Sequence, residues 1–158
     1  IANEPFAVIL PDDVIAAETP CLQQMVEAYE ENPGCMVAAM EVPQSQTSAY
    51  GILDVAEDMG ARVSVKGMVE KPDVDKAPSN LAVIGRYILT PDVLRNLNKK
   101  KSGAGGEIQL TDAMAKMIGT QPFHAVTFSG RRYDCGSKTG FFGHTPTHAR
   151  AAGRFHAQ

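Results

Sequence analysis

The sequence predicts an α/β domain built on a mixed, mostly parallel sheet. Continuous apolar runs of strand length recur along the chain, and helix-length segments with one apolar face lie between several of them. Pro, Gly and Asn residues separate the two kinds of segment. Strands that alternate with helices are typical of a layered domain in which helices cover a sheet. The 158 residues are enough for one such domain with a substantial core.

The expected strands are apolar runs rich in Val, Ile, Leu and Ala, bounded by Pro, Gly, Asn or Asp. They are residues 5–10, 35–42, 80–89 and 123–128, with a hairpin of residues 51–56 and 62–69 that turns at residues 58–60. The runs at 5–10 and 123–128 have few polar residues, which indicates strands buried inside the sheet.

Two of the expected helices begin at a Thr-Pro pair. Pro is favoured at the first helical position, because its missing N–H would have no partner there, and Thr is a common N-cap. Thr19-Pro20 would start one helix, which ends at residues 32–34, and Thr90-Pro91 would start another. A third helix is expected over residues 107–118, with its apolar side chains largely inward.

Composition narrows the possible partners and location. The formal net charge is −3, with both signs interspersed, so we expect neither a nucleic acid nor an anionic membrane as partner. No apolar run approaches the roughly 20 residues of a membrane span. The cysteines Cys21, Cys35 and Cys135 are odd in number and have no Cys-x-x-Cys spacing, which favours reduced thiols and a cytoplasmic location.

An acid and a base stand side by side where one expected strand ends. Glu70 and Lys71 follow the strand at 62–69 and precede Pro72. In open α/β sheets, side chains at strand ends can reach into the crevice where ligands bind. Glu70 could accept hydrogen bonds from hydroxyl groups, and Lys71 could neutralise an anion such as a sugar phosphate. A surface ion pair is the alternative reading of the same two residues.

Carboxylates follow two further strands. Asp12 and Asp13 come directly after the strand at 5–10, and Asp134 comes a few residues after the strand at 123–128. Carboxylates from separate strand ends can share one divalent cation, and Mg²⁺ usually takes one or two carboxylates together with substrate phosphate oxygens. Asp beside a turn also commonly caps a loop or a helix, so a structural role for each of them stays open.

The chain resembles the sugar-1-phosphate nucleotidyltransferase family, in its UTP–glucose-1-phosphate uridylyltransferase branch. Six segments occur in the family's order and cover nearly everything from residue 4 to about 142. They are residues 6–13, 49–51, 69–72, 77–87, 103–113 and 133–138. The resemblance implies a Rossmann-like nucleotidyltransferase fold and a reaction in which UTP and glucose 1-phosphate give UDP-glucose and pyrophosphate.

The resemblance also implies an incomplete chain. The family's Gly-Gly-x-Gly-Thr-Arg motif has no match, so we expect the fold to be incomplete at the N-terminus and the base pocket to lie upstream. Residues 1–142 would be the C-terminal portion of the domain, with the sugar-phosphate and metal site. Residues 143–158 form an atypical tail, interrupted by Pro146. Its His144 and His148 have the spacing of a metal pair, but a surface segment explains them as well.

The family's metal and phosphate residues carry over to matching positions. The resemblance implies that Asp12 and Asp134 hold Mg²⁺ and that Lys71 is the catalytic residue, contacting the phosphate of glucose 1-phosphate. We also expect a homo-oligomer in the complete protein. Two alternatives stay open: a related sugar-1-phosphate nucleotidyltransferase that uses another nucleoside triphosphate, and a non-catalytic fragment or interaction module. We expect this chain alone to be inactive.

The sugar-binding residues carry over in the same way. The resemblance implies that Glu70 binds glucose hydroxyls, that Gly51 lies close to the sugar and that Asn80 bonds a sugar hydroxyl. Gly51 could equally permit a turn, and Asn80 could be a turn residue that opens a strand. The Gly-rich residues 103–106 could offer backbone N–H groups to a ligand, but a flexible loop explains them as well, so we leave them out of the site.

Overall fold

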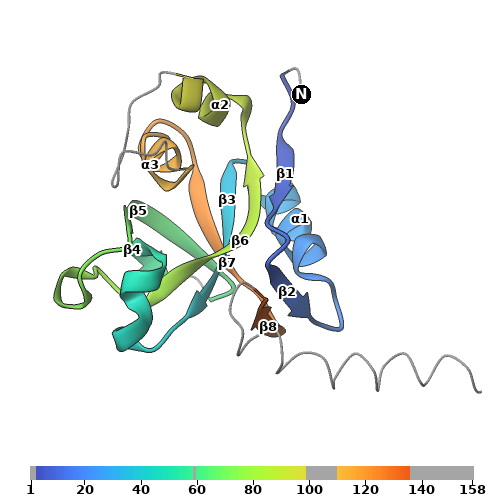
Figure 1. The fold of residues 1–158 in the computed structure, drawn as a ribbon. Helices are drawn as coiled ribbons and strands as arrows, with labels where there is room; N and C mark the ends of the chain where they lie inside the picture. Colours follow the sequence, from blue (N-terminus) through green and yellow to red (C-terminus); the bar gives the residue numbers. More distant parts are fainter. Residues whose placement is uncertain (1–2, 59, 99–109, 136–158) are drawn as a thin grey trace, which may run out of the picture.

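The computed structural model describes residues 3–58, 60–98 and 110–135 (Figure 1). The Gly-rich residues 103–106, the start of the third expected helix and the tail 143–158, with the predicted pair His144 and His148, lie outside these ranges. None of the described helices is long and apolar enough to cross a membrane.

The described strands and helices follow the predicted order. The strands are β1 (Phe6–Ile9), β2 (Asp13–Ala16), β3 (Cys35–Glu41), β4 (Gly51–Asp58), β5 (Arg62–Glu70), β6 (Leu81–Leu89), β7 (Phe123–Thr127) and β8 (Arg131–Asp134). The helices are α1 (Cys21–Glu31), α2 (Pro91–Asn98) and α3 (Leu110–Ala115), with 3₁₀ turns η1 (Gln44–Ala49) and η2 (Val74–Lys76). The β4–β5 hairpin and the strands β3, β6 and β7 therefore confirm the sequence prediction.

Six strands form one mixed sheet in the order β1-β6-β3-β7-β5-β4. Among the described residues the only parallel pair is β3–β7, and every other pair in this sheet is antiparallel. The expectation of a mostly parallel sheet was therefore wrong. Alternating strands and helices predict parallel strands only where successive strands become neighbours joined by a helical crossover. Here most neighbouring strands are not consecutive in the chain.

The sheet curls until β4 meets β6. Ile52 of β4 pairs with Ala82 of β6, so β6 contacts β1, β3 and β4. A register shift between Val37 and Ala38 lies on the β3–β6 pairing, and such irregularities increase the local bend and twist of a strand. This curvature brings the start of β4 and the end of β5 toward the middle of β6, where the candidate site lies.

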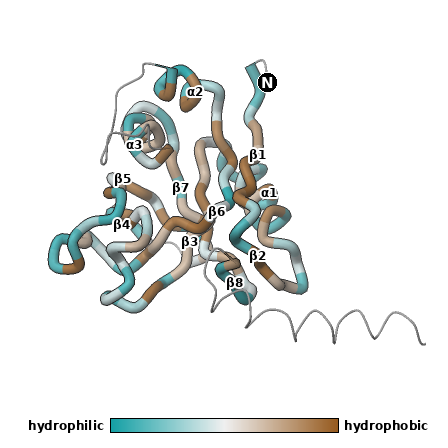
Figure 2. Tube along the Cα trace, in the orientation of Figure 1, coloured by the Kyte–Doolittle hydropathy of each residue, from teal (hydrophilic) through white to brown (hydrophobic). Residues whose placement is uncertain are grey.

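Both faces of β3 are buried, and alternate residues pack into different clusters. Cys35, Val37 and Ala39 join the larger cluster, which contains residues of α2 and α3, whereas Met36 and Ala38 join the cluster that contains residues of α1. Helix α1 contacts β3, β6 and β7, and Figure 1 shows it away from α2 and α3. Figure 2 shows the apolar colouring along the central strands that this two-sided burial requires.

The first strand is an edge strand, although the sequence predicted a buried one. Within the described residues β1 pairs only with β6, and its exposure alternates from residue to residue. Ile9 is 51% exposed. An uninterrupted apolar run cannot distinguish a central strand from an edge strand, because both pack at least one face on the core.

A second sheet of two strands was not predicted at all. β2 and β8 pair antiparallel, with Asp13 opposite Asp134 and Ala16 opposite Arg131. Each strand has four residues, so the apolar run of β2 is too short to predict a strand, and β8 begins with two arginines. This ribbon contains the candidate metal ligand Asp134, and the other candidate, Asp12, directly precedes β2.

The helix starts differ slightly from the prediction. Helix α1 begins at Cys21, and Pro20 rather than Thr19 occupies the N-cap position, without a side-chain hydrogen bond to the helix. Pro20 has extended backbone angles, so it ends the preceding loop instead of opening the helix. Helix α2 begins at Pro91 as predicted.

We predict that Gly85→Ala destabilises the chain by about 2 kcal/mol. A Cβ at this position of β6 would lie 2.8 Å from Asp13 Oδ2 and 2.8 Å from Leu10 Cβ, so the buried carboxylate would have to move. Gly67→Ala in β5 is the matched control, because its Cβ would meet nothing closer than 3.4 Å. Urea unfolding followed by circular dichroism measures both, and equal stabilities of the two variants would contradict the prediction.

Candidate functional site

A cavity of about 470 Å³ brings together five of the six site residues that the sequence predicted. They are Asp12, Gly51, Glu70, Lys71 and Asp134. The cavity lies where β1 and β5 end and β4 begins, across the middle of β6, and the ribbon of β2 and β8 forms one side of it. Other residues that line it are Leu10, Asp13, Ala49, Tyr50, Val83, Gly85, Tyr87, Leu110, Thr111 and Arg132.

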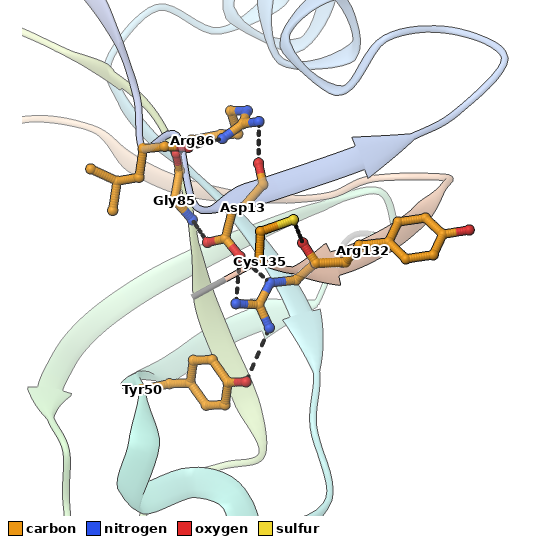
Figure 3. A network of polar contacts seen from close by, with 8 residues as sticks. Asp13, Tyr50, Gly85, Arg86, Arg132 and Cys135 are labelled. Carbon is orange, nitrogen blue, oxygen red and sulfur yellow. Dashed lines mark hydrogen bonds and ion pairs between the residues drawn. The ribbon is translucent and has the colours of Figure 1, made fainter. Parts of the chain in front are cut away.

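Asp13 organises one end of this cavity (Figure 3). Its side chain is buried and accepts hydrogen bonds on both oxygens: Gly85 N–H donates to Oδ2 over 3.0 Å, and Arg132 Nε–H donates to Oδ1 over 2.5 Å. The Arg86 guanidinium donates to the Asp13 backbone carbonyl over 2.5 Å. Because a buried carboxylate is costly without partners, these contacts fix the start of β2 against β6.

The β2–β8 ribbon brings the two predicted metal carboxylates together. Asp13 pairs with Asp134, and the Cys135 N–H donates to the Asp12 carbonyl over 2.7 Å. Asp12 is exposed and Asp134 is half-buried, and both line the cavity. The sequence predicted Asp134 only as a residue past the strand at 123–128, and the structure shows that it is the last residue of a further strand, β8.

Arg132 is held by Asp13 and Tyr50. Its side chain is 12% exposed and forms an ion pair with Asp13. Its Nη1 donates to the Tyr50 hydroxyl over 3.0 Å, and its guanidinium carbon lies 5.2 Å from the centre of the Tyr50 ring. Burial disfavours the charged form, but the hydrogen bond with Tyr50 and the charge of Asp13 more than offset it, so the pKa of Arg132 is raised.

Glu70 and Lys71 form the other end of the cavity. Lys71 has a φ of 45°, in the left-handed region that side chains rarely adopt, and its N–H donates to the Tyr50 carbonyl over 2.9 Å. Lys71 Nζ lies 4.0 Å from Glu70 Oε1, with 62% of the lysine side chain exposed and 14% of the glutamate side chain. The lysine charge is therefore accessible, while the carboxylate is largely enclosed.

Gly51 lies against this pair. A Cβ on Gly51 would approach Glu70 Oε2 to 3.2 Å and Thr111 Cγ2 to 3.4 Å. A side chain here would therefore push against the Glu70 carboxylate and the start of α3. The absence of a side chain keeps this end of the cavity open.

Several carboxylates act on the middle of this cavity. Burial and then the charges of Asp13, Glu70 and Asp12 together raise the pKa of Tyr87 to about 12. Tyr87 lies on β6 and lines the cavity, so carboxylates from two segments, Asp12-Asp13 and Glu70, act on one side chain. A cation would be favoured at this place.

Asn80 does not reach this cavity. It is exposed and lines a different one, together with Ser79 and Glu41 at the start of β6 and the end of β3. The structure thus separates Asn80 from Glu70 and Lys71, and its predicted contact with a sugar hydroxyl stays a prediction. Among the described residues no group of three or more His, Cys, Asp or Glu side chains is arranged to hold a metal ion.

Sequence reasoning assigned no role to Tyr50, Gly85 or Tyr87, although these three lie in segments that carried the resemblance, nor to Arg132, which directly precedes the last of those segments. One signal was present: two adjacent acids, Asp12-Asp13, allow one to be buried while the other faces a ligand. A buried acid requires a cationic or hydrogen-bonding partner, but the sequence does not say which of the chain's arginines supplies it.

Comparison with known proteins supports the same assignment. A family model described as nucleotidyl transferase matches residues 1–149. A UTP–glucose-1-phosphate uridylyltransferase of Komagataeibacter xylinus is 58% identical over 138 residues, which are 87% of this chain and 49% of that protein. One from Staphylococcus haemolyticus is 51% identical over 141 residues, 89% of this chain and 49% of that protein.

A solved structure extends the similarity to the fold. The crystal structure of a UDP-glucose pyrophosphorylase complexed with UDP-glucose matches with a TM-score of 0.90 at 41% identity, over 96% of this chain and 58% of that one. This match confirms the expected α/β nucleotidyltransferase fold with its mixed sheet. The chain spans about half the length of the curated relatives, 49% in each of the two above. It belongs to the nucleotidyl transferase family.

Proposed function

We propose that the protein containing this chain transfers a uridylyl group from UTP to glucose 1-phosphate, giving UDP-glucose and pyrophosphate. The observation that carries the proposal is the pairing of an accessible lysine and an enclosed glutamate with two carboxylates, all in one cavity. The relatives named uridylyltransferases support the choice of UTP and glucose 1-phosphate.

Lys71 and Glu70 would bind the sugar phosphate. Lys71 Nζ, exposed at the cavity's edge, is suited to the phosphate group, because a compact ammonium ion interacts strongly with anions. Glu70 has only acceptor oxygens when ionised, so it would accept hydrogen bonds from glucose hydroxyls. Gly51 would leave room for the sugar beside that carboxylate.

Asp12 and Asp134 fit a Mg²⁺ ion that is shared with the substrates. Two carboxylates are too few for a metal site made by the protein alone, but Mg²⁺ commonly takes one or two carboxylates and completes its shell with water and phosphate oxygens. The charges of Asp13, Glu70 and Asp12, which add to burial in raising the pKa of Tyr87, favour a cation here. When bound, the ion would neutralise charge on the phosphates.

The reaction needs positioning more than acid–base chemistry. A phosphate oxygen of glucose 1-phosphate attacks the α-phosphorus of UTP, the bond to the bridging oxygen breaks, and pyrophosphate leaves. Lys71 would hold the attacking phosphate and Glu70 would orient the sugar, so that the attacking oxygen is in line with the leaving group.

The direct test uses the protein encoded by the full reading frame that contains this chain. With Mg²⁺, UTP and glucose 1-phosphate it should release pyrophosphate and form UDP-glucose, measured by a coupled pyrophosphate assay and chromatography. Faster turnover with dTTP, ATP or GTP would change the assigned nucleotide. Turnover with none of the four would contradict the proposed function.

Asp134→Asn should reduce Mg²⁺-dependent turnover at least a hundredfold in that protein, because the substitution removes a charged ligand oxygen without changing the side chain's size. Circular dichroism and thermal melting should show a folded protein. Asp92→Asn on α2 is the control: Asp92 is 46% exposed and pairs only at the surface with Arg95, so turnover should be unchanged. Near-normal activity of Asp134→Asn would exclude a ligand role.

Lys71→Gly should be more stable than Lys71→Ala by about 1 kcal/mol, because Gly adopts the left-handed backbone without strain and Ala does not. Both variants should lose saturable binding of glucose 1-phosphate in calorimetric titration. Urea unfolding measures the stability difference. If Lys71→Ala were as stable as Lys71→Gly, the backbone of Lys71 would not be strained, and its conformation would not need to be explained by function.

A further inference from the structure

Arg132 contacts both ends of the cavity. It binds Asp13 at the end with the two candidate metal carboxylates, and it binds Tyr50 at the end with Glu70 and Lys71 (Figure 3). Asp13 and Tyr50 belong to segments far apart in the sequence, one at the start of β2 and the other just before β4. Among the residues that line the cavity, Arg132 therefore links two groups with different predicted roles.

At the first end, Arg132 acts through Asp13. The carboxylate receives Arg132 on Oδ1 and the Gly85 N–H on Oδ2, so it ties β8 to β6 through the start of β2. Asp12 precedes this anchored residue, and its carbonyl accepts the Cys135 N–H. The backbone that carries Asp12 thus depends on the carboxylate beside it.

At the second end, Arg132 acts through Tyr50. Its Nη1 donates to the tyrosine hydroxyl and its guanidinium lies over the tyrosine ring. The Tyr50 carbonyl accepts the Lys71 N–H, at the residue whose backbone is left-handed. Such a conformation persists only where its surroundings hold it, and the hydrogen bond to Tyr50 is one of the contacts that do so.

Arg132 is not placed to bind a phosphate itself. Each of its three side-chain nitrogens has a partner within the protein, Nε and Nη2 at Asp13 and Nη1 at Tyr50. Its side chain is 12% exposed, against 62% for Lys71. An arginine used in this way fixes the geometry of its neighbours, because its planar fork can bind two groups at defined angles.

We infer that Arg132 is a positioning residue that fixes the metal-carboxylate end and the sugar-phosphate end of the cavity relative to each other. The inference rests on the proposed function for the names of the two ends, but the coupling itself is a property of the folded chain. It makes the placement of Lys71 and of Asp12 depend on one guanidinium.

Hydrogen exchange tests the coupling without any ligand. Arg132→Lys keeps a positive charge but cannot bind Asp13 and Tyr50 with the same fork, so exchange at the Lys71 and Cys135 amides should accelerate at least tenfold, measured by NMR. Tyr50→Phe removes the hydroxyl and keeps the ring. It should accelerate exchange at Lys71 alone.

Two controls separate positioning from loss of stability. Arg131→Lys changes the neighbouring arginine, which is exposed and lies over the Tyr133 ring instead, and should leave both amides unchanged. Cys35 is the first residue of β3, and its amide donates to the Pro122 carbonyl. This amide should exchange at the same rate in every variant. Equal acceleration at Cys35 and Lys71 would mean general destabilisation and would overturn the inference.

Binding then connects the coupling to the site. In calorimetric titration with glucose 1-phosphate, Tyr50→Phe should weaken binding about threefold to tenfold, although Tyr50→Phe leaves Arg132 and its charge in place. Arg132→Lys should weaken binding more, and in the full reading frame it should also raise the Mg²⁺ concentration for half-maximal turnover. Tyr50→Phe should leave that concentration unchanged.

The outcomes distinguish failure of the inference from failure of the function. If the unmodified protein binds glucose 1-phosphate but Tyr50→Phe binds it equally well and exchanges normally at Lys71, the inference is wrong. If only Arg132→Lys weakens binding, Arg132 contacts the phosphate directly, which also overturns it. If the unmodified protein binds no sugar phosphate, the proposed function fails, and the exchange rates alone decide whether Arg132 holds both ends.

Discussion

The ion pair between Asp13 and Arg132 is the contact on which the site depends. Both side chains are nearly buried, with 10% and 12% exposed, and burying two charges costs several kcal/mol for each ion unless further hydrogen bonds compensate. The Gly85 N–H and the Tyr50 hydroxyl supply those bonds. The pair therefore draws β2, β6, β8 and the segment before β4 to one point, and a small residue at Gly85 is required for the carboxylate to fit.

This arrangement explains why two acids stand next to each other after β1. Asp13 has a structural role, since both of its carboxylate oxygens accept hydrogen bonds from the protein. Asp12 is exposed toward the cavity and contributes charge to it. Neither acid could perform both tasks, because a carboxylate held by an arginine and a backbone amide has few lone pairs left for a metal ion. The pair thus separates the holding of the backbone from the binding of a cation.

The parts of the fold that the sequence predicted are those with a strong local pattern. The strands β3 and β6 are apolar on both faces, and the β4–β5 hairpin has an apolar run on each side of its turn. The direction of the strands depends on which of them become neighbours, and no local pattern encodes that. The ribbon of β2 and β8 was missed because each strand is short and one of them begins with charged residues.

The candidate site divides in the same way. Glu70 and Lys71 could be recognised because they are adjacent and follow a strand. The bond between Asp13 and Arg132 joins residues 119 positions apart, so only the folded chain reveals it. Asn80 differs from these residues: its segment matched the family, but the structure places it on another cavity, so its role stays a prediction. Sequence motifs therefore pointed to most of the candidate site residues, but not to the residues that contact them in the folded chain.

The same contacts imply that the cavity is formed before any ligand binds. Its carboxylates and its lysine are held by backbone hydrogen bonds and by a buried arginine, not by long flexible side chains alone. A site of this kind loses little conformational entropy when a ligand binds, so more of the contact energy is available for affinity. The strained backbone of Lys71 fits this view, since strain is retained where the surrounding structure enforces one geometry. The sugar-phosphate end should therefore keep its shape in the chain described here.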